Sequence, residues 1–224
     1  MTEQHPAAVL WDMDGTLIDT EPYWLSAEQE LVYSYGGTWT HEDGLALVGS
    51  GLWDSAEIFR ARGVDLTADE IVDHLTDAVL ARVRAEVPWR PGARELLAAV
   101  REAGIPTALV TMSVHRMAAY VADAIGFEAF DVIVAGDDVT QSKPHPEPYL
   151  RAAELLDVLP SACVALEDSP PGLASAIAAG VTTIGVPLHV AIESGPDHTV
   201  WGTLDGKTLD DLLNVYRDSL GVSA

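Results

Sequence analysis

Short runs of apolar residues alternate with longer amphipathic segments along most of this chain. Five runs are too uniformly apolar for strands with one face in water, and each has the length of a strand buried on both faces. In chain order they read AVLWDM, PTALVTM, DVIVAG, SACVALED and VTTIGVP. Between and after them, apolar positions recur with helical spacing at residues 93–103, 114–125, 146–156 and 172–179. This alternation predicts an α/β fold with a doubly wound parallel sheet.

One long segment, residues 21–87, interrupts this alternation. It holds no convincing strand but three amphipathic patterns, YWLSAEQELVYSY, DSAEIFRAR and ADEIVDHLTDAVLARVRA. The stretch VPWRPG closes it with two prolines and a glycine and predicts a hinge. We therefore predict an all-helical insert at residues 21–87, within a Rossmann-like α/β core domain formed by residues 1–20 and 88–224. Near the end of the chain, HTVWGTL predicts an edge strand and residues 210–216 a last helix.

Composition and charge limit the partners of the protein. Hydrophobic residues make up 48% of the 224 positions, enough to form a core, and the formal net charge is -23. Such a field repels nucleic acid and anionic membranes, so we expect neither as a partner, and no obligatory protein partner is evident. Cys163 is the single cysteine, the N-terminal segment lacks the features of a signal peptide, and no apolar run approaches the roughly 20 residues of a membrane span. These features predict a cytoplasmic protein.

Polar side chains gather where the predicted strands end. They are Asp12, Asp14, Thr111, Ser113, Lys143, Glu167 and Asp168. In an open α/β sheet, ligands bind beyond the carboxyl ends of the strands, so we expect these side chains to lie together. Crowded carboxylates repel one another, and a bound Mg²⁺ would offset this repulsion. Carboxylates and substrate phosphate oxygens are its usual ligands. The pattern therefore predicts half of a Mg²⁺ site, completed by a phosphorylated substrate.

Each of these features has a simpler explanation when it is taken alone. Asp-Gly is a common turn pair, a Thr or Ser after a strand often caps the next helix, and SKPHP is also a plausible proline-stiffened loop. Their occurrence together, in this order and at strand ends, favours a site. Lys143 supports it further, because the chain has only two lysines against ten arginines. A compact ammonium suits a phosphate oxygen or a nucleophilic carboxylate.

The motifs DMDGT, VTMS, SKPHP and LEDS together resemble the four motifs of the haloacid dehalogenase-like hydrolase superfamily. The helical insert after the first motif is similar to the small helical cap of its subfamily I. The resemblance covers essentially the whole chain, and DMDGTLIDTEPYW is similar to the opening of its sugar-phosphate and hexitol-phosphate phosphatases. It implies a Mg²⁺-dependent phosphatase that acts on a small phosphorylated metabolite, such as a sugar or polyol phosphate.

The resemblance also implies a role for each motif residue. Asp12 is the nucleophile that forms an aspartyl-phosphate, and Asp14 is the general acid and then the general base. Thr111 and Lys143 bind the transferring phosphoryl group. The implied ligands of Mg²⁺ are Asp12, the backbone carbonyl of Asp14, Asp168 and, in support through water, Glu167.

Differences between this sequence and the motifs of other enzymes of the superfamily reduce the number of reaction types to consider. Dehalogenases of the superfamily lack an acid at the position of Asp14, and phosphonatases use a cap lysine, whereas residues 21–87 contain no lysine. A β-phosphoglucomutase-type phosphotransferase is the alternative; that branch carries an arginine in a glycine-containing cap loop. The similar loop here, LVGSGLWDS, has no arginine and favours a phosphatase. The order of the motifs argues against a non-enzymatic receiver domain, whose phosphorylated aspartate follows a later strand.

Substrate selection is expected from the cap. The candidates are Gly49 and Trp53 in the loop LVGSGLWDS, with Glu21 and Trp24 at the start of the insert. An aromatic face can stack on a sugar ring and a carboxylate can accept hydroxyl protons; packing of the aromatic residues within the cap is the alternative. Ser113 is expected either to contact the substrate or to cap the helix that follows it.

Overall fold

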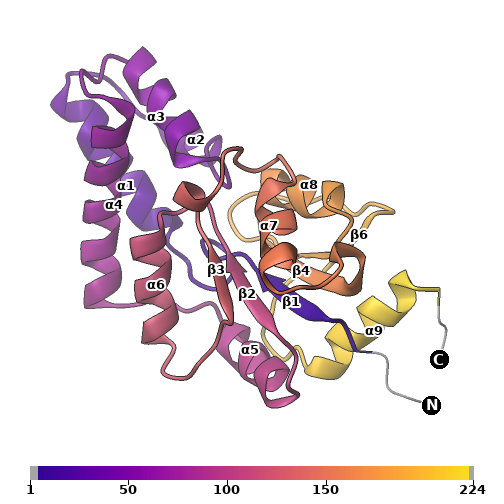
Figure 1. Cartoon of the computed structure of the whole chain (residues 1–224). Coiled ribbons are helices and arrows are strands. Elements are labelled where there is room, and N and C mark those ends of the chain that lie inside the picture. Colours follow the sequence, from indigo (N-terminus) through magenta and orange to yellow (C-terminus); the bar gives the residue numbers. More distant parts are fainter. Residues whose placement is uncertain (1–4, 222–224) are drawn as a thin grey trace.

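The structure, a computed structural model, describes residues 5–221 and contains a parallel sheet between two layers of helices (Figure 1). Its six strands pair in the order β3-β2-β1-β4-β5-β6, every pair parallel. The strands are β1 (Ala8–Trp11), β2 (Thr107–Val110), β3 (Val132–Val134), β4 (Cys163–Glu167), β5 (Thr182–Gly185) and β6 (His198–Val200). The predicted doubly wound α/β fold is confirmed, and β6 is the predicted edge strand.

Helices cover both faces of the sheet. They are α5 (Ala93–Glu102), α6 (His115–Ala124) and α9 (Leu209–Ser219) on one face, and α7 (Glu147–Leu155) and α8 (Pro170–Ala178) on the other. Successive strand residues point to opposite faces, so Val9 and Trp11 join the apolar cluster of the first face, whereas Ala8 and Leu10 join that of the second. No helix of residues 5–221 is both long and apolar enough to cross a membrane.

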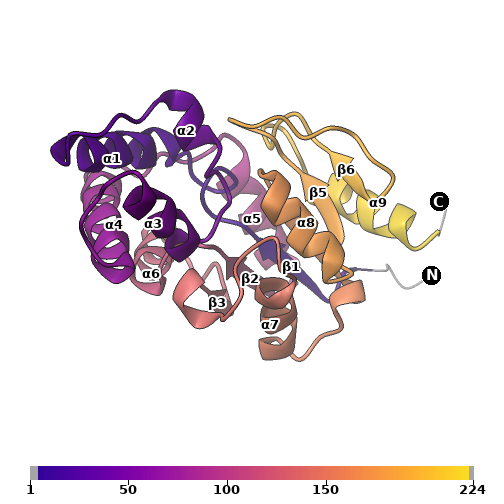
Figure 2. The same ribbon diagram turned by 90° about the horizontal axis from the view of Figure 1, so that it is seen from above.

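The insert between β1 and α5 is helical, as predicted. Its helices are α1 (Glu21–Ser34), α2 (His41–Leu45), α3 (Leu52–Ala61) and α4 (Ala68–Ala85). They lie beyond the carboxyl ends of the strands (Figures 1 and 2). The short helix α2 was not predicted, because five residues are too few to show a helical period; a capping box between Thr40 and Asp43 begins it. The division of the chain into cap and core domains at residues 21 and 87 stays a prediction.

Polar contacts connect the insert to helix α6 and to the loop before α7. Arg116 of α6 pairs with Asp73 and Asp77 of α4. The Ser142 hydroxyl, in the loop before α7, donates to Asp54 Oδ2 of α3 at 2.5 Å. The ion pairs are exposed, and such pairs contribute little stability each. The apolar cluster on the first face continues into the insert, so buried apolar area does most to hold the insert over the strand ends.

The turn that returns the chain from the insert to α5 is closely packed. Gly92 has a φ of 80°, and a Cβ built on it would lie 2.1 Å from the backbone oxygen of Leu204. Both the left-handed conformation and the close approach of another backbone therefore require glycine at this position.

Replacing Gly92 with alanine is expected to destabilise the protein more than the same change at a glycine with free space. Gly104 is the matched control, because its φ is 73° and a Cβ there would meet nothing within 4 Å. Gly104→Ala should lower the free energy of unfolding by about 1–2 kcal/mol, the cost of left-handed backbone. Gly92→Ala adds a backbone clash and should lose at least about 3 kcal/mol in urea unfolding. Equal losses for the two variants would contradict this packing.

Candidate active site

Three adjacent strands end at the same edge of the sheet, because β1 lies between β2 and β4. Seven predicted residues are brought together there: Asp12 and Asp14 after β1, Thr111 and Ser113 after β2, Lys143 from the loop before α7, Glu167 at the end of β4, and Asp168 directly after it. Backbone pairing sets this convergence, since residue 166 of β4 stands beside residue 11 of β1.

Lys143 is buried between two carboxylates. Its Nζ lies 2.7 Å from Asp12 Oδ1 and 2.6 Å from Glu167 Oε1, and it donates to the Val110 carbonyl at 3.0 Å. The Tyr149 hydroxyl donates to Glu167 Oε1 at 2.5 Å. Burial by itself lowers the pKa of Lys143, but the charges of Asp12 and Glu167 outweigh burial and raise that pKa above its ordinary value. Lys143 is therefore a fixed positive charge beside Asp12.

Asp12 and Asp168 each keep one carboxylate oxygen without a hydrogen-bond partner within residues 5–221; in both residues the atom is a buried Oδ2. Burial and the charge of Glu167 raise the pKa of Asp12, and the charge of Lys143 lowers it; the result is a pKa of about 7. Burial and the charges of Asp12 and Glu167 also raise the pKa of Asp168 well above its usual range. Oxygens of Asp12, Glu167 and Asp168 lie within 4.8 Å of one another. Such an oxygen donor set suits a hard divalent cation.

Gly15 makes room for one of these carboxylates. Its φ is 85°, and a Cβ on it would lie 1.9 Å from Asp168 Oδ2. The buried Arg90 holds the same turn, because its Nη1 donates to the Gly15 carbonyl at 2.6 Å and to the Val186 carbonyl at 2.8 Å. The glycine of the DMDGT motif is thus required by backbone conformation and by the approach of Asp168.

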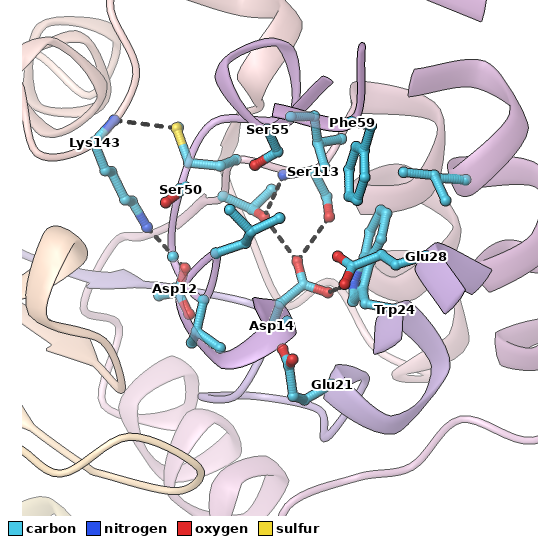
Figure 3. A pocket seen from close by; sticks show the side chains of 18 residues that line it. Asp12, Asp14, Glu21, Trp24, Glu28, Ser50, Ser55, Phe59, Ser113 and Lys143 are labelled. Atoms are coloured by element: carbon cyan, nitrogen blue, oxygen red, sulfur yellow. Dashed lines mark hydrogen bonds and ion pairs between the residues drawn. The ribbon is translucent and has the colours of Figure 1, made fainter. Parts of the chain in front are cut away.

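Asp14 points away from Asp12 and into a cavity under the insert (Figure 3). Its Oδ1 accepts from the Thr20 hydroxyl at 2.5 Å and from Trp24 Nε1 at 3.2 Å. Its Oδ2 accepts from the Thr111 hydroxyl at 3.1 Å and from the Ser113 hydroxyl at 2.7 Å. Four donors from three segments therefore fix the orientation of this carboxyl group.

The insert forms the other wall of this cavity. Of the four cap residues expected to bind substrate, Glu21, Trp24 and Gly49 line it. Burial, followed by the charges of Glu28, Asp14 and Asp19, raises the pKa of Glu21 to about 8. The structure does not bring Trp53 into the cavity. That residue lines a neighbouring groove, and its Nε1 donates to Asp69 Oδ1 at 2.8 Å.

Further cavity residues were not anticipated from the sequence, and Glu28 is the most informative of them. Its carboxyl group is buried, and burial, opposed by a hydrogen bond from Trp39 Nε1 at 3.0 Å, raises its pKa to about 7. Glu21, Trp24 and Glu28 are three and four positions apart, which places them on one face of α1, so the spacing offered a signal. The others come from different segments and had no such signal; they include Ser50, Ser55, Phe59 and Leu75.

Comparison with known proteins places this arrangement in a family. A model of the haloacid dehalogenase-like hydrolases matches residues 6–180. A phosphorylated carbohydrates phosphatase of Thermotoga maritima is 32% identical, over 95% of this chain and 99% of the relative. Hexitol phosphatase B of Escherichia coli is also 32% identical, over 85% of this chain and 87% of the relative. The chain belongs to the haloacid dehalogenase-like hydrolase family, and the prediction of a phosphatase enzyme of this family is confirmed.

Solved structures agree with this assignment. The crystal structure of CbbY from Rhodobacter sphaeroides in complex with phosphate is 31% identical, with a TM-score of 0.83, and the match covers 92% of this chain and 99% of that one. The β-phosphoglucomutase of Clostridium difficile gives a TM-score of 0.85 at 21% identity, over 96% of this chain and 99% of that one. The second likeness is one of fold.

The buried Glu28 should make stability depend on pH. Its pKa of about 7 in the folded protein exceeds the ordinary 4.5, so the folded state keeps a proton that the unfolded chain releases. The resulting stabilisation is full below pH 4.5 and is lost as the pH rises through 7. Between pH 5 and pH 8, the wild type should lose about 2–3 kcal/mol of unfolding free energy through this group, and Glu28→Gln should lose none of it.

Urea unfolding at the two pH values measures this difference. Glu30→Gln is the control, because Glu30 lies on the same helix with 68% of its side chain exposed, and this variant should follow the wild type. An identical pH dependence in the wild type and Glu28→Gln would mean that Glu28 ionises as it does in water.

Proposed function

We propose that this protein is a Mg²⁺-dependent phosphomonoester hydrolase that acts on a small sugar or polyol phosphate through an aspartyl-phosphate on Asp12. One observation carries the proposal: the two carboxyl groups of the first loop point in different directions. Asp12 lies beside Lys143 among the other carboxylates, whereas Asp14 faces the cavity under the insert. This separation provides one carboxylate for attack and another for proton transfer. The names of the relatives, which refer to phosphorylated carbohydrates and hexitols, support the substrate class.

In the first step, a carboxylate oxygen of Asp12 forms a bond to phosphorus while the ester P–O bond breaks. The Nζ of Lys143, 2.7 Å from Asp12 Oδ1, offsets the negative charge that the phosphoryl oxygens bring to this carboxylate. The leaving alcohol oxygen takes its proton from the carboxyl group of Asp14, which faces the cavity where the rest of the substrate binds.

In the second step, Asp14 is a carboxylate and takes a proton from a water molecule. The water oxygen bonds to phosphorus, the P–O bond to Asp12 breaks, and inorganic phosphate leaves. Three of the four donors around Asp14 are hydroxyls, from Thr20, Thr111 and Ser113. Because a hydroxyl can donate or accept, these contacts suit both protonation states of Asp14.

The proposed Mg²⁺ ligands are Asp12, the backbone carbonyl of Asp14, and Asp168, with Glu167 in support. The unpartnered Oδ2 atoms of Asp12 and Asp168 fit direct ligation. The Oε1 atom of Glu167 is already occupied by Lys143 and Tyr149, which suits an indirect role. A bound divalent ion would supply the positive charge that allows a phosphate to approach a cluster of carboxylates.

The surroundings of the cap arginines favour water over a sugar phosphate as the acceptor. A mutase must hold the non-reacting phosphate of its substrate, which needs a cation in the cap. The arginines of the insert lie in other contacts: Arg60 with Glu57, Arg62 with Asp43, Arg82 with Glu30, and Arg84 over the ring of Tyr120. Lys143 is the one cationic residue among those that line the cavity. A second phosphate therefore meets acids in the cap and no counter-charge.

Asp12→Asn is expected to abolish turnover, because the amide keeps the shape of the side chain but is a poor nucleophile. Phosphate release with Mg²⁺ should fall at least about 1,000-fold. Asp65→Asn, at an exposed position in the insert, is the control and should keep wild-type activity. Both variants are first shown to fold by cooperative unfolding. Wild-type phosphate release from folded Asp12→Asn would refute the aspartyl-phosphate.

The acceptor is tested by supplying β-glucose 1-phosphate with a trace of glucose 1,6-bisphosphate and Mg²⁺, while glucose 6-phosphate and inorganic phosphate are both followed. We expect inorganic phosphate to appear without accumulation of glucose 6-phosphate, because the cap offers the second phosphate no cation. With EDTA in place of Mg²⁺, neither product should form. Faster accumulation of glucose 6-phosphate than of inorganic phosphate would identify a mutase.

A further inference from the structure

The carboxyl group of Glu28 lies in the cap half of the cavity, on the other side of Asp14 from Asp12 and Lys143 (Figure 3). It is 7% exposed, on the face of α1 that also carries Glu21 and Trp24 into the cavity. Position 28 is thus a core position of the helix, where an apolar side chain is the ordinary choice. A carboxylate there needs a physical reason.

The protein satisfies this carboxylate only in part. Among the described residues, Trp39 Nε1 is its one hydrogen-bond donor, at 3.0 Å from Oε2. An ionised carboxylate can accept about four hydrogen bonds, and a buried one is costly unless its oxygens find donors. The Trp39 side chain is itself buried and its ring packs against Phe59, so this hydrogen bond fixes the orientation of Glu28. Oε1 accepts no hydrogen bond from the described residues.

The chemistry around Glu28 identifies the ligand group. The cavity wall near it contributes the hydroxyl of Ser55, the backbone of Gly44 and the apolar side chains of Phe59 and Leu75. Glu21 adds a second carboxyl group. Acceptor oxygens without a cation suit a ligand that donates hydrogen bonds and carries no negative charge. The hydroxyl groups of a neutral polyol meet both conditions, and the apolar walls suit its carbon chain.

We propose that Glu28 is a substrate-binding residue whose Oε1 accepts a hydrogen bond from a hydroxyl group of the alcohol that is released. On this proposal, which rests on the proposed phosphatase function, the enzyme selects neutral, hydroxyl-bearing phosphomonoesters over esters without a further hydroxyl or with a second anionic group. Trp39 is a positioning residue, because its indole N–H turns Oε1 of Glu28 toward the cavity.

Glu28→Gln is the most specific change for a test. The Trp39 N–H requires an acceptor, so the carboxamide oxygen takes that place and the NH₂ group faces the cavity. The substitution keeps the shape of residue 28 and exchanges an acceptor for a donor. Glu30→Gln, on the exposed side of the same helix, is the matched control.

The experiment compares sorbitol 6-phosphate with phenyl phosphate, which has no hydroxyl group to bind. At pH 8, where Glu28 with its pKa of about 7 is mostly ionised, Glu28→Gln should lower kcat/KM for sorbitol 6-phosphate about 10-fold, mainly through KM, because a hydrogen bond to a charged group is lost. The value for phenyl phosphate should stay within about two-fold, since Asp12, Asp14 and Lys143 are untouched, and Glu30→Gln should change neither value. Product inhibition gives an independent measurement: free sorbitol should inhibit Glu28→Gln less than the wild type, and inorganic phosphate should inhibit both equally.

The outcomes separate this inference from the function on which it rests. If the wild type releases phosphate from neither ester, the phosphatase function fails and the inference with it. If the wild type hydrolyses sorbitol 6-phosphate and Glu28→Gln leaves both its KM and sorbitol inhibition unchanged, the role of Glu28 is refuted and the phosphatase function stands. Equal decreases of kcat/KM on both esters, with unchanged sorbitol inhibition, would mean that Glu28 stabilises the insert without binding substrate, and would also refute the inference.

Discussion

The buried ammonium of Lys143 between Asp12 and Glu167 is the interaction on which the rest of the site depends. Oxygens of three buried carboxylates lie within 4.8 Å of one another, and burial strengthens their repulsion. Lys143 compensates two of them directly. Because Lys143 comes from the loop before α7, and Tyr149 of α7 donates to Glu167, the packing of that helix is tied to the charge balance of the site.

Asp14, the second carboxylate of the loop after β1, has a different environment because the chain turns sharply there. Gly15 adopts a left-handed conformation, and Arg90 donates a hydrogen bond to its carbonyl oxygen. Asp14, the residue before this turn, points into the cavity. Two aspartates separated by one residue thus have distinct surroundings: one lies with the cationic lysine, the other among hydroxyl and indole donors. Their proposed division into nucleophile and proton carrier follows from this geometry.

The cavity is polarised from end to end. Lys143, the one cationic residue of the cavity lining, and the proposed divalent ion lie at the strand ends, whereas the cap end carries Glu21, Glu28 and hydroxyl groups. On the proposed function, this arrangement reconciles a net charge of -23 with a phosphorylated substrate, because the phosphate would meet positive charge and the alcohol half would meet acceptors. Selection for neutral alcohols is then the expected consequence of an acidic cap.

The sequence by itself determined the longer helices, the strands and the edge of the sheet where the polar residues meet, because period and motif order are local properties of the chain. Helix α4, for example, has the bounds that its apolar spacing predicts. Only the tertiary structure decided which side chains of the insert line the cavity: Trp53 donates to Asp69 outside it, whereas Glu28, not singled out from the sequence, is part of the cavity wall. The reason is physical. A helical period shows which side of a helix is buried, but the packing of several helices over the strand ends sets what that side contacts.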